Sequence, residues 1–122
     1  MLSGQNSAIT EKLAGLVSKA GAKIASAIEN ASQQTGVEFS YLLQKAQIES
    51  SFKEDAKAST SSATGLFQFI DKTWLSMVDK YGDKYGIDTA NRSKKEILEL
   101  RKDASLCSLM AAEMASDNKD YL

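Results

Sequence analysis

The sequence predicts a mainly α-helical fold. Apolar residues recur at helical spacing along most of the chain, and no window of strict alternation is long enough to predict a strand. Proline, the residue that most disrupts helices, is absent from all 122 residues. With 43% hydrophobic and 25% charged residues, the chain has the composition of a globular protein, and its length suits one core.

Two helices are expected at the start of the chain. Residues 7–19 and residues 22–35 both carry apolar side chains at helical spacing. Gly36 stands where a helix-terminating glycine belongs. We expect residues 1–35 to form an N-terminal helical segment packed on a domain of residues 36–122.

A third helix is expected at residues 41–52, with Ser40 as its N-cap. Residues 53–64 are small and polar, with four consecutive Ser or Thr at 59–62, which indicates an ordered loop with room for a short β excursion. Residues 65–70 are apolar and compact.

The last part of the chain is expected to be helical again. Asp71 is placed to cap a helix at residues 72–81. Two further helices are expected at residues 93–102 and 103–116.

The charge balance excludes some classes of partner. Fifteen Lys and Arg against sixteen Asp and Glu give a net charge of −1, and only two of the cations are Arg. We therefore expect no nucleic-acid-binding surface. No apolar run approaches the length of a membrane span. The first residues lack the basic and apolar regions of a signal peptide.

The side-chain inventory limits the possible chemistry. With no His and a single Cys, Cys107, we expect no metal site, no cofactor and no internal disulfide. Any acid–base catalysis must use carboxylates, Lys or Tyr. Cys107 and Trp74 are expected in the core.

Glu49 is the most informative residue of the expected third helix. On a helical wheel it lies about 20° from Leu42, at the edge of an apolar stripe that includes Ala46, and Tyr41 lies on its other side. A carboxylate between apolar patches should be partly desolvated, which favours the protonated form that a general acid needs. Lys45, four residues earlier, offers the alternative of a surface ion pair.

Three motifs surround this residue. The chain reads AQIESSF at 46–52, AKAS at 56–59 and ATGLFQF at 63–69. In this order and at nearly this spacing, the motifs resemble the lytic transglycosylase domain of the soluble-transglycosylase (SLT) type, a member of the lysozyme-like superfamily near goose-type lysozyme. The family pattern is a helix ending in Glu-Ser-x-Phe, an Ala-x-Ser loop and Gly-Leu-Met-Gln, with Phe67 here at the Met position. The resemblance covers roughly residue 36 to the end.

The resemblance implies a compact lysozyme-like helical domain with an ordered polar loop beside the catalytic helix. It also implies cleavage of the β-1,4 bond between N-acetylmuramic acid and N-acetylglucosamine in peptidoglycan, with Glu49 as the catalytic residue. In this family one Glu protonates the leaving oxygen and then takes the proton of the muramic 6-hydroxyl, which attacks the anomeric carbon and leaves a 1,6-anhydro end. One carboxylate suffices because the nucleophile belongs to the substrate, whereas an ordinary glycosidase needs a second one.

The resemblance also implies substrate-binding residues. Gln68 matches the Gln of Gly-Leu-Met-Gln, and its amide can both donate to and accept from sugar groups. Ser50 follows the acid and is expected to orient local hydrogen bonds. Ser59 stands for the cleft Ser, although two residues rather than one separate it from Ala56. Gly65 is best explained as a backbone requirement.

The implied partner is the peptidoglycan glycan strand, which places the protein in the periplasm or cell envelope. Enzymes of this type often open the wall for flagella, pili or secretion machines, so such a machine, or self-association, is a further implied partner.

One departure concerns the end of the chain. The family continues with an Ala-Tyr-Asn-Ala-Gly-type segment that faces the Glu across the cleft, whereas Asn118 and Tyr121 lack the neighbours of that motif. We therefore expect a domain without its C-terminal part that is weakly active. We also expect its last helix to expose apolar side chains that promote self-association; these would be among Leu106, Leu109, Met110 and Met114.

Two rival functions stay open. Glu113 also borders an apolar stripe, so a hydrolytic muramidase with Glu49 and Glu113 as its two carboxylates is one alternative. A buried structural hydrogen bond is the favoured interpretation of Glu113. The other alternative is a non-catalytic glycan-binding or assembly module on the same fold.

Overall fold

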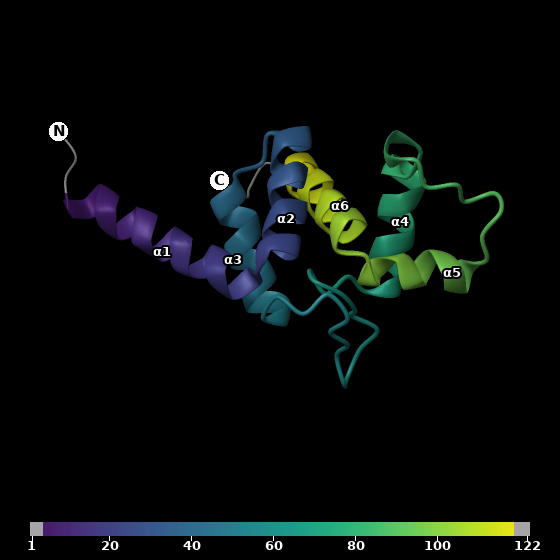
Figure 1. Ribbon diagram of the computed structural model, residues 1–122. Helices are drawn as coiled ribbons and strands as arrows, with labels where there is room; N and C mark the ends of the chain where they lie inside the picture. Colours follow the sequence, from purple (N-terminus) through teal and green to yellow (C-terminus); the bar gives the residue numbers. More distant parts are fainter. Residues whose placement is uncertain (1–3, 119–122) are drawn as a thin grey trace.

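The computed structural model describes the backbone of residues 4–118 and the side chains of residues 10–118 (Figure 1). Tyr121 lies outside the described residues. In the described part, the elements are α1 (Gly4–Ala20), α2 (Ala22–Thr35), α3 (Phe39–Ser50), α4 (Asp71–Tyr81), the 3₁₀ helix η1 (Asp83–Tyr85), α5 (Lys94–Glu99), the 3₁₀ helix η2 (Leu100–Lys102) and α6 (Ala104–Asp117). The predicted mainly α-helical class is confirmed.

The helix ends follow the sequence prediction in part. Helix α2 has the predicted bounds, and Gly36 ends it with a left-handed φ of 80°. Helix α3 begins before Ser40, and Glu38 occupies the N-cap position, so the predicted Ser40 cap is wrong. The predicted Asp71 cap is also wrong, because Asp71 lies in the first turn of α4 and Ile70 precedes it. An acidic side chain in a first turn is favourable because it faces the positive end of the helix dipole.

The two final predicted helices are present with changes. The segment predicted at 93–102 divides into α5 and η2. Ser93 and Glu96 form a capping box at the start of α5, in which each side chain accepts the other residue's backbone N–H. At the start of α6, the Asp103 carboxylate accepts the backbone N–H of Leu106 at 2.9 Å.

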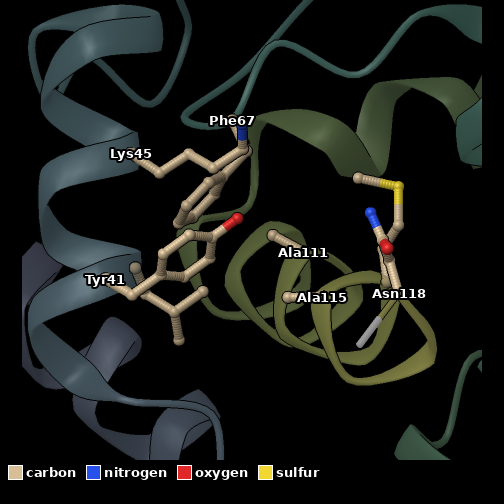
Figure 2. A pocket seen from close by; sticks show the side chains of 8 residues that line it. Tyr41, Lys45, Phe67, Ala111, Ala115 and Asn118 are labelled. Carbon is tan, nitrogen blue, oxygen red and sulfur yellow. The ribbon is translucent and has the colours of Figure 1, made fainter. Parts of the chain in front are cut away.

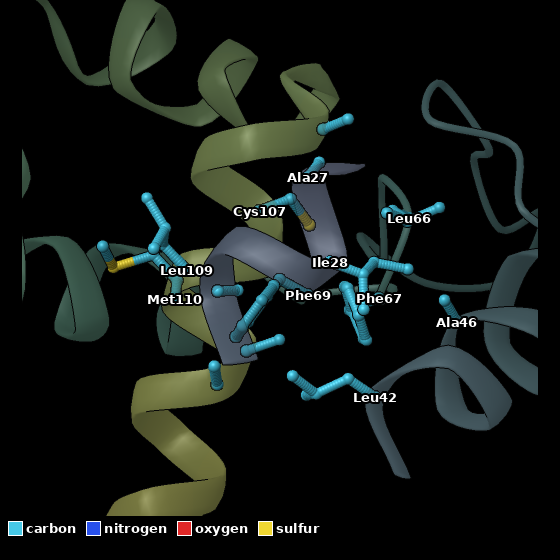
Figure 3. Packing of buried hydrophobic residues seen from close by; sticks show 14 of the residues in the cluster. Ala27, Ile28, Leu42, Ala46, Leu66, Phe67, Phe69, Cys107, Leu109 and Met110 are labelled. Carbon is cyan, nitrogen blue, oxygen red and sulfur yellow. The ribbon is translucent and has the colours of Figure 1, made fainter. Parts of the chain in front are cut away.

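The hydrophobic core lies where α2, α3 and α6 meet (Figure 3). Ile28 from α2, Leu42 from α3 and Met110 from α6 are fully buried there. Helix α4 packs against α6, and the indole N–H of its buried Trp74 donates to the carbonyl of Ile97 in α5 at 2.8 Å. Trp74 and Cys107 are core residues, as the sequence predicts.

Helix α6 does not expose the apolar face that was expected of it. Leu109 and Met110 are buried, while Leu106 and Met114 are half-buried. The reason is that both α2 and α4 pack against this helix. The predicted self-association through an exposed α6 is therefore not supported by its packing.

Helix α1 extends away from the rest of the molecule (Figure 1). Its later residues contact α2 and α3, with Leu16 buried and Leu13 and Val17 half-buried. No helix within residues 4–118 is both long enough and apolar enough to cross a membrane.

Candidate active site

Glu49 lies in the last turn of α3 with its side chain 36% exposed. Its carboxylate oxygen Oε2 is 3.6 Å from Nζ of Lys45, one helical turn earlier. The carboxylate is thus partly covered by the protein but open to a ligand, and the ion pair expected from the i, i+4 spacing is present.

Glu49 opens into a hollow of about 300 Å³. The walls come from α3, from the segment before α4, from the first turn of α4 and from α6. The lining residues are Lys45, Glu49, Phe67, Gln68, Phe69, Ile70, Thr73 and Met114. The structure therefore brings Glu49 and Gln68 into the lining of one hollow, as the family resemblance implied.

Two further hollows continue along α3. One of about 120 Å³ lies between α3 and α6 and is lined by Tyr41 and Phe67 together with Ala111 and Asn118 (Figure 2). The other, of about 200 Å³, is lined by α3 alone. All three hollows have Lys45 in their lining. We call the three together the α3 groove.

The side chain of Gln68 is held by backbone carbonyls of the loop that precedes it. Its amide nitrogen donates to the carbonyls of Ala56 at 3.1 Å and Gly65 at 2.9 Å. An amide nitrogen has two hydrogens, so both are engaged and the side-chain carbonyl oxygen is the group left for a ligand. Its backbone has a left-handed φ of 54°, which is uncommon for a residue other than glycine.

The backbone directly after α3 also adopts left-handed conformations. Ser51 and Phe52, directly after α3, have φ values of 53° and 65°. Such conformations cost free energy and concentrate at functional sites. Here they turn the chain sharply after Glu49 and leave this residue at the exposed end of its helix.

The family model of the transglycosylase SLT domain matches residues 26–97. The chain belongs to this family. The match spans well over half of the chain, contains both Glu49 and Gln68, and includes most of α2. It supports lytic transglycosylase activity on peptidoglycan at the level of the family, on a lysozyme-like helical fold.

The two Ser residues predicted to bind substrate in this SLT domain lie away from the groove surface. Ser50 is buried, and its hydroxyl donates to the carbonyl of Ala46 within α3 at 3.0 Å. Ser59 is exposed in the loop after α3 and lines none of the three hollows. Neither side chain belongs to the lining of the hollow at Glu49.

Arg101 organises the loop of the SLT domain, and sequence reasoning missed it. Its buried guanidinium donates from Nη1 to the carbonyls of Ser62 at 2.9 Å and Phe69 at 3.0 Å. From Nε it donates to the carbonyl of Leu98 at 2.9 Å, and Nη1 lies 2.7 Å from the Asp71 carboxylate. Local sequence patterns carry no signal for these contacts, because most of them join residues more than 25 positions apart.

The backbone of Gly65 passes directly beside the backbone of Arg101. The φ of Gly65 is 91°, and a Cβ at this position would lie 2.2 Å from the backbone oxygen of Arg101. The prediction that Gly65 meets a backbone requirement is confirmed.

Tyr41, Lys45 and Glu49 share one face of α3 in the groove. Their i, i+4 spacing is a signal from which the groove-lining roles of Tyr41 and Lys45 were predictable. The contributions of Phe67, from the loop, and Met114, from α6, required the tertiary structure.

The carboxylate of Glu113 is engaged in contacts within the folded protein. Glu113 is buried in α6, and its carboxylate accepts hydrogen bonds from Lys84 Nζ at 2.7 Å and from the Tyr85 hydroxyl. The bond to Glu113 raises the pKa of Lys84, and burial together with this carboxylate raises the pKa of Tyr85. The favoured interpretation as a buried structural hydrogen bond is confirmed, and Glu113 lines none of the three hollows.

In the described part of the chain, no group of three or more Cys, Asp or Glu is placed to hold a metal ion.

Proposed function

We propose that this SLT domain is a lytic transglycosylase that uses Glu49 as its only acid and base. Glu49 protonates the glycosidic oxygen between N-acetylmuramic acid and N-acetylglucosamine, and the bond to the anomeric carbon breaks. The carboxylate then accepts the proton of the muramic 6-hydroxyl, whose oxygen bonds to the anomeric carbon. The products are a 1,6-anhydromuramic end and a free 4-hydroxyl, and no water is consumed.

The observation that carries this proposal is the composition of the α3 groove. Among the described residues that line it, Glu49 is the only carboxylate. A hydrolytic glycosidase needs a second carboxylate, on the order of 5–10 Å from the first, to activate water or to act as nucleophile. A transglycosylase needs only one because the substrate supplies the nucleophile, held in place within the same sugar ring.

The neighbouring residues suggest supporting roles. The Gln68 carbonyl oxygen can accept a hydrogen bond from an acetamide N–H or a sugar hydroxyl at the hollow that contains Glu49. We propose that Ser50 acts as a positioning residue, because its hydroxyl bonds within the last turn of α3. We assign Ser59 no contact in the groove.

The substrate also implies a location. Peptidoglycan lies outside the cytoplasmic membrane, so we propose that the protein acts in the periplasm or cell envelope.

The decisive variant is Glu49→Gln, which keeps the size of the side chain and removes its proton transfer. We expect a loss of about 10²–10⁴-fold in turnover of purified peptidoglycan, with an unchanged circular dichroism spectrum. The matched control is Glu99→Gln, which changes an exposed carboxylate that pairs with Lys102 at 3.1 Å. Soluble products are identified by liquid chromatography and mass spectrometry.

The products separate the alternatives. Anhydro ends from the wild type support the proposal, whereas reducing ends that disappear in Glu113→Gln identify a muramidase. Glycan binding without any product identifies a binding module. Cleavage by Glu49→Gln at the wild-type rate overturns the assignment of the catalytic residue.

A further inference from the structure

The α3 groove contains a single cation. Among its described lining residues, Lys45 is the only Lys or Arg, just as Glu49 is the only carboxylate. Lys45 lines all three hollows and keeps a side-chain exposure of 40%. Its ammonium group is therefore accessible to whatever occupies the groove.

The ion pair of Lys45 with Glu49 is easily exchanged. At 3.6 Å, the separation of Nζ from Oε2 is longer than a hydrogen bond. Ion pairs between partly exposed side chains contribute little free energy, because water competes for both groups. An ammonium group offers three donors, so Lys45 can turn to an anionic group of a ligand.

The apolar side chains around this ammonium group strengthen its electrostatic attraction to a charged ligand. Tyr41, Phe67 and Met114 line the same hollow as Lys45 (Figure 2). Apolar walls lower the effective dielectric constant once a ligand displaces water, and this increases the difference between a charged and a neutral ligand group. A charge on the substrate next to Lys45 will thus be distinguished from a neutral group of the same shape.

On the muramic ring of the proposed substrate, the lactyl group carries such a charge in one form only. The lactyl group on the 3-oxygen of muramic acid is an amide when a stem peptide is attached, and it is a free carboxylate when the stem has been removed. Lys45 and Glu49 lie four residues apart on α3, about 6 Å along the helix axis. This spacing is similar to that between the anomeric carbon and the lactyl carboxylate of one muramic ring.

We propose that Lys45 binds the free lactyl carboxylate of muramic acid, and that the domain prefers glycan strands from which the stem peptides have been removed. This inference rests on the proposed function, since it places the muramic ring with its anomeric carbon at Glu49. Lys45 is a specificity-determining residue, and no proton or bond is transferred to it.

The test compares three glycan substrates. The first is glycan strands treated with an amidase that removes the stem peptides and leaves free lactyl carboxylates. The second is the same strands with these carboxylates coupled to methylamine, which makes them neutral at nearly the same size. The third is strands that keep their stem peptides. The rate of formation of anhydro ends gives kcat/KM for each substrate.

We expect the wild type to have a kcat/KM about fivefold higher for the carboxylate strands than for the methylamide strands. Lys45→Arg keeps this ratio, and Lys45→Met brings it close to one. The matched control is Lys19→Met, which removes an exposed cation of α1 outside the groove and leaves the ratio unchanged.

Three results overturn the proposal. One is a wild-type ratio near one, and another is a ratio that survives in Lys45→Met. The third is a wild-type preference for stem-bearing strands that is lost in Lys45→Met. This result would mean that Lys45 binds a carboxylate of the stem peptide and not the lactyl carboxylate.

A failure of the proposed function has a separate signature, namely the absence of anhydro ends with every substrate. The role of Lys45 is then tested by calorimetric titration of Glu49→Gln with the first two strand types. Tighter binding of the carboxylate strands supports the role of Lys45, and equal affinities overturn it.

Discussion

Arg101 donates a hydrogen bond from its buried guanidinium to the backbone carbonyl of Phe69 at 3.0 Å, across 32 positions of the sequence. Phe69 and its neighbour Gln68 line the hollow beside Glu49. A residue outside the groove thus holds the segment that faces the candidate acid. The same guanidinium also bonds the Ser62 carbonyl, so both ends of this segment depend on one side chain.

Replacing Arg101 should therefore affect both stability and substrate binding. In Arg101→Met, the carbonyls of Ser62 and Phe69 each lose a hydrogen bond from the charged guanidinium, although each still accepts one from Thr64. Each lost bond should cost about 1.5–3 kcal/mol. We expect a lower melting temperature by circular dichroism and a higher KM for glycan strands. Arg101→Lys, which restores a charge but not the planar fork, should recover only part of the loss. A melting temperature equal to that of the wild type would contradict this role.

The close approach of Gly65 to Arg101 leads to a second prediction. In Gly65→Ala the new Cβ would lie 2.2 Å from the Arg101 carbonyl oxygen, and its φ of 91° is unfavourable for alanine. We expect destabilisation of at least about 1–3 kcal/mol, measured by urea unfolding. The matched control is Gly15→Ala in α1, where nothing lies within 4 Å of the new Cβ. That variant should be stabilised by about 0.5–1 kcal/mol. Equal effects of the two substitutions would show that the contact is unimportant.

Stability should fall at alkaline pH. Lys84 and Tyr85 have pKa values raised above their ordinary values of 10.5 and 10.0, the first through its bond to Glu113 and the second through burial and then that bond. The folded state thus keeps protons that the unfolded state loses. Their contribution to stability is complete below about pH 10 and is lost as the pH rises through the raised pKa values.

The measurement is the melting temperature between pH 7 and pH 11. In Glu113→Gln the carboxylate that raises the pKa of Lys84 is gone, so the decline above pH 10 should be shallower than in the wild type. Lys80 and Tyr81, whose pKa values are raised mainly by Asp117, keep part of the decline in both proteins. Parallel curves for the two proteins would argue against a contribution from Glu113.

Cys107 should be unreactive in the folded protein. Its thiol is buried in α6, and burial raises its pKa to about 12. The nucleophilic thiolate is therefore almost absent at pH 8. We expect no reaction with a disulfide reagent such as DTNB under native conditions and one equivalent of reaction in denaturant. Rapid native labelling would show that this part of the core opens easily.

Much of the helical framework was predictable from the sequence, because its determinants are local. The apolar spacing of residues 22–35 and the glycine that follows them predict α2 with its observed bounds. Glu49 and Gln68 belong to motifs that lie less than 25 residues apart, and the family resemblance carried by these motifs implied that both line one cleft. Where a prediction failed locally, as at the caps of α3 and α4, the error was one or a few residues at a helix end.

Only the tertiary structure determined which distant groups meet. Helices α2 and α4 pack against α6, which buries Leu109 and Met110 and leaves Leu106 and Met114 half-buried. Glu113 is bonded to Lys84 and Tyr85, and Arg101 reaches back to hold the segment beside Glu49. These contacts depend on how helices pack and on which buried polar groups must find partners. Because such partners come from any part of the chain, the periodicity of a single helix contains no information about them.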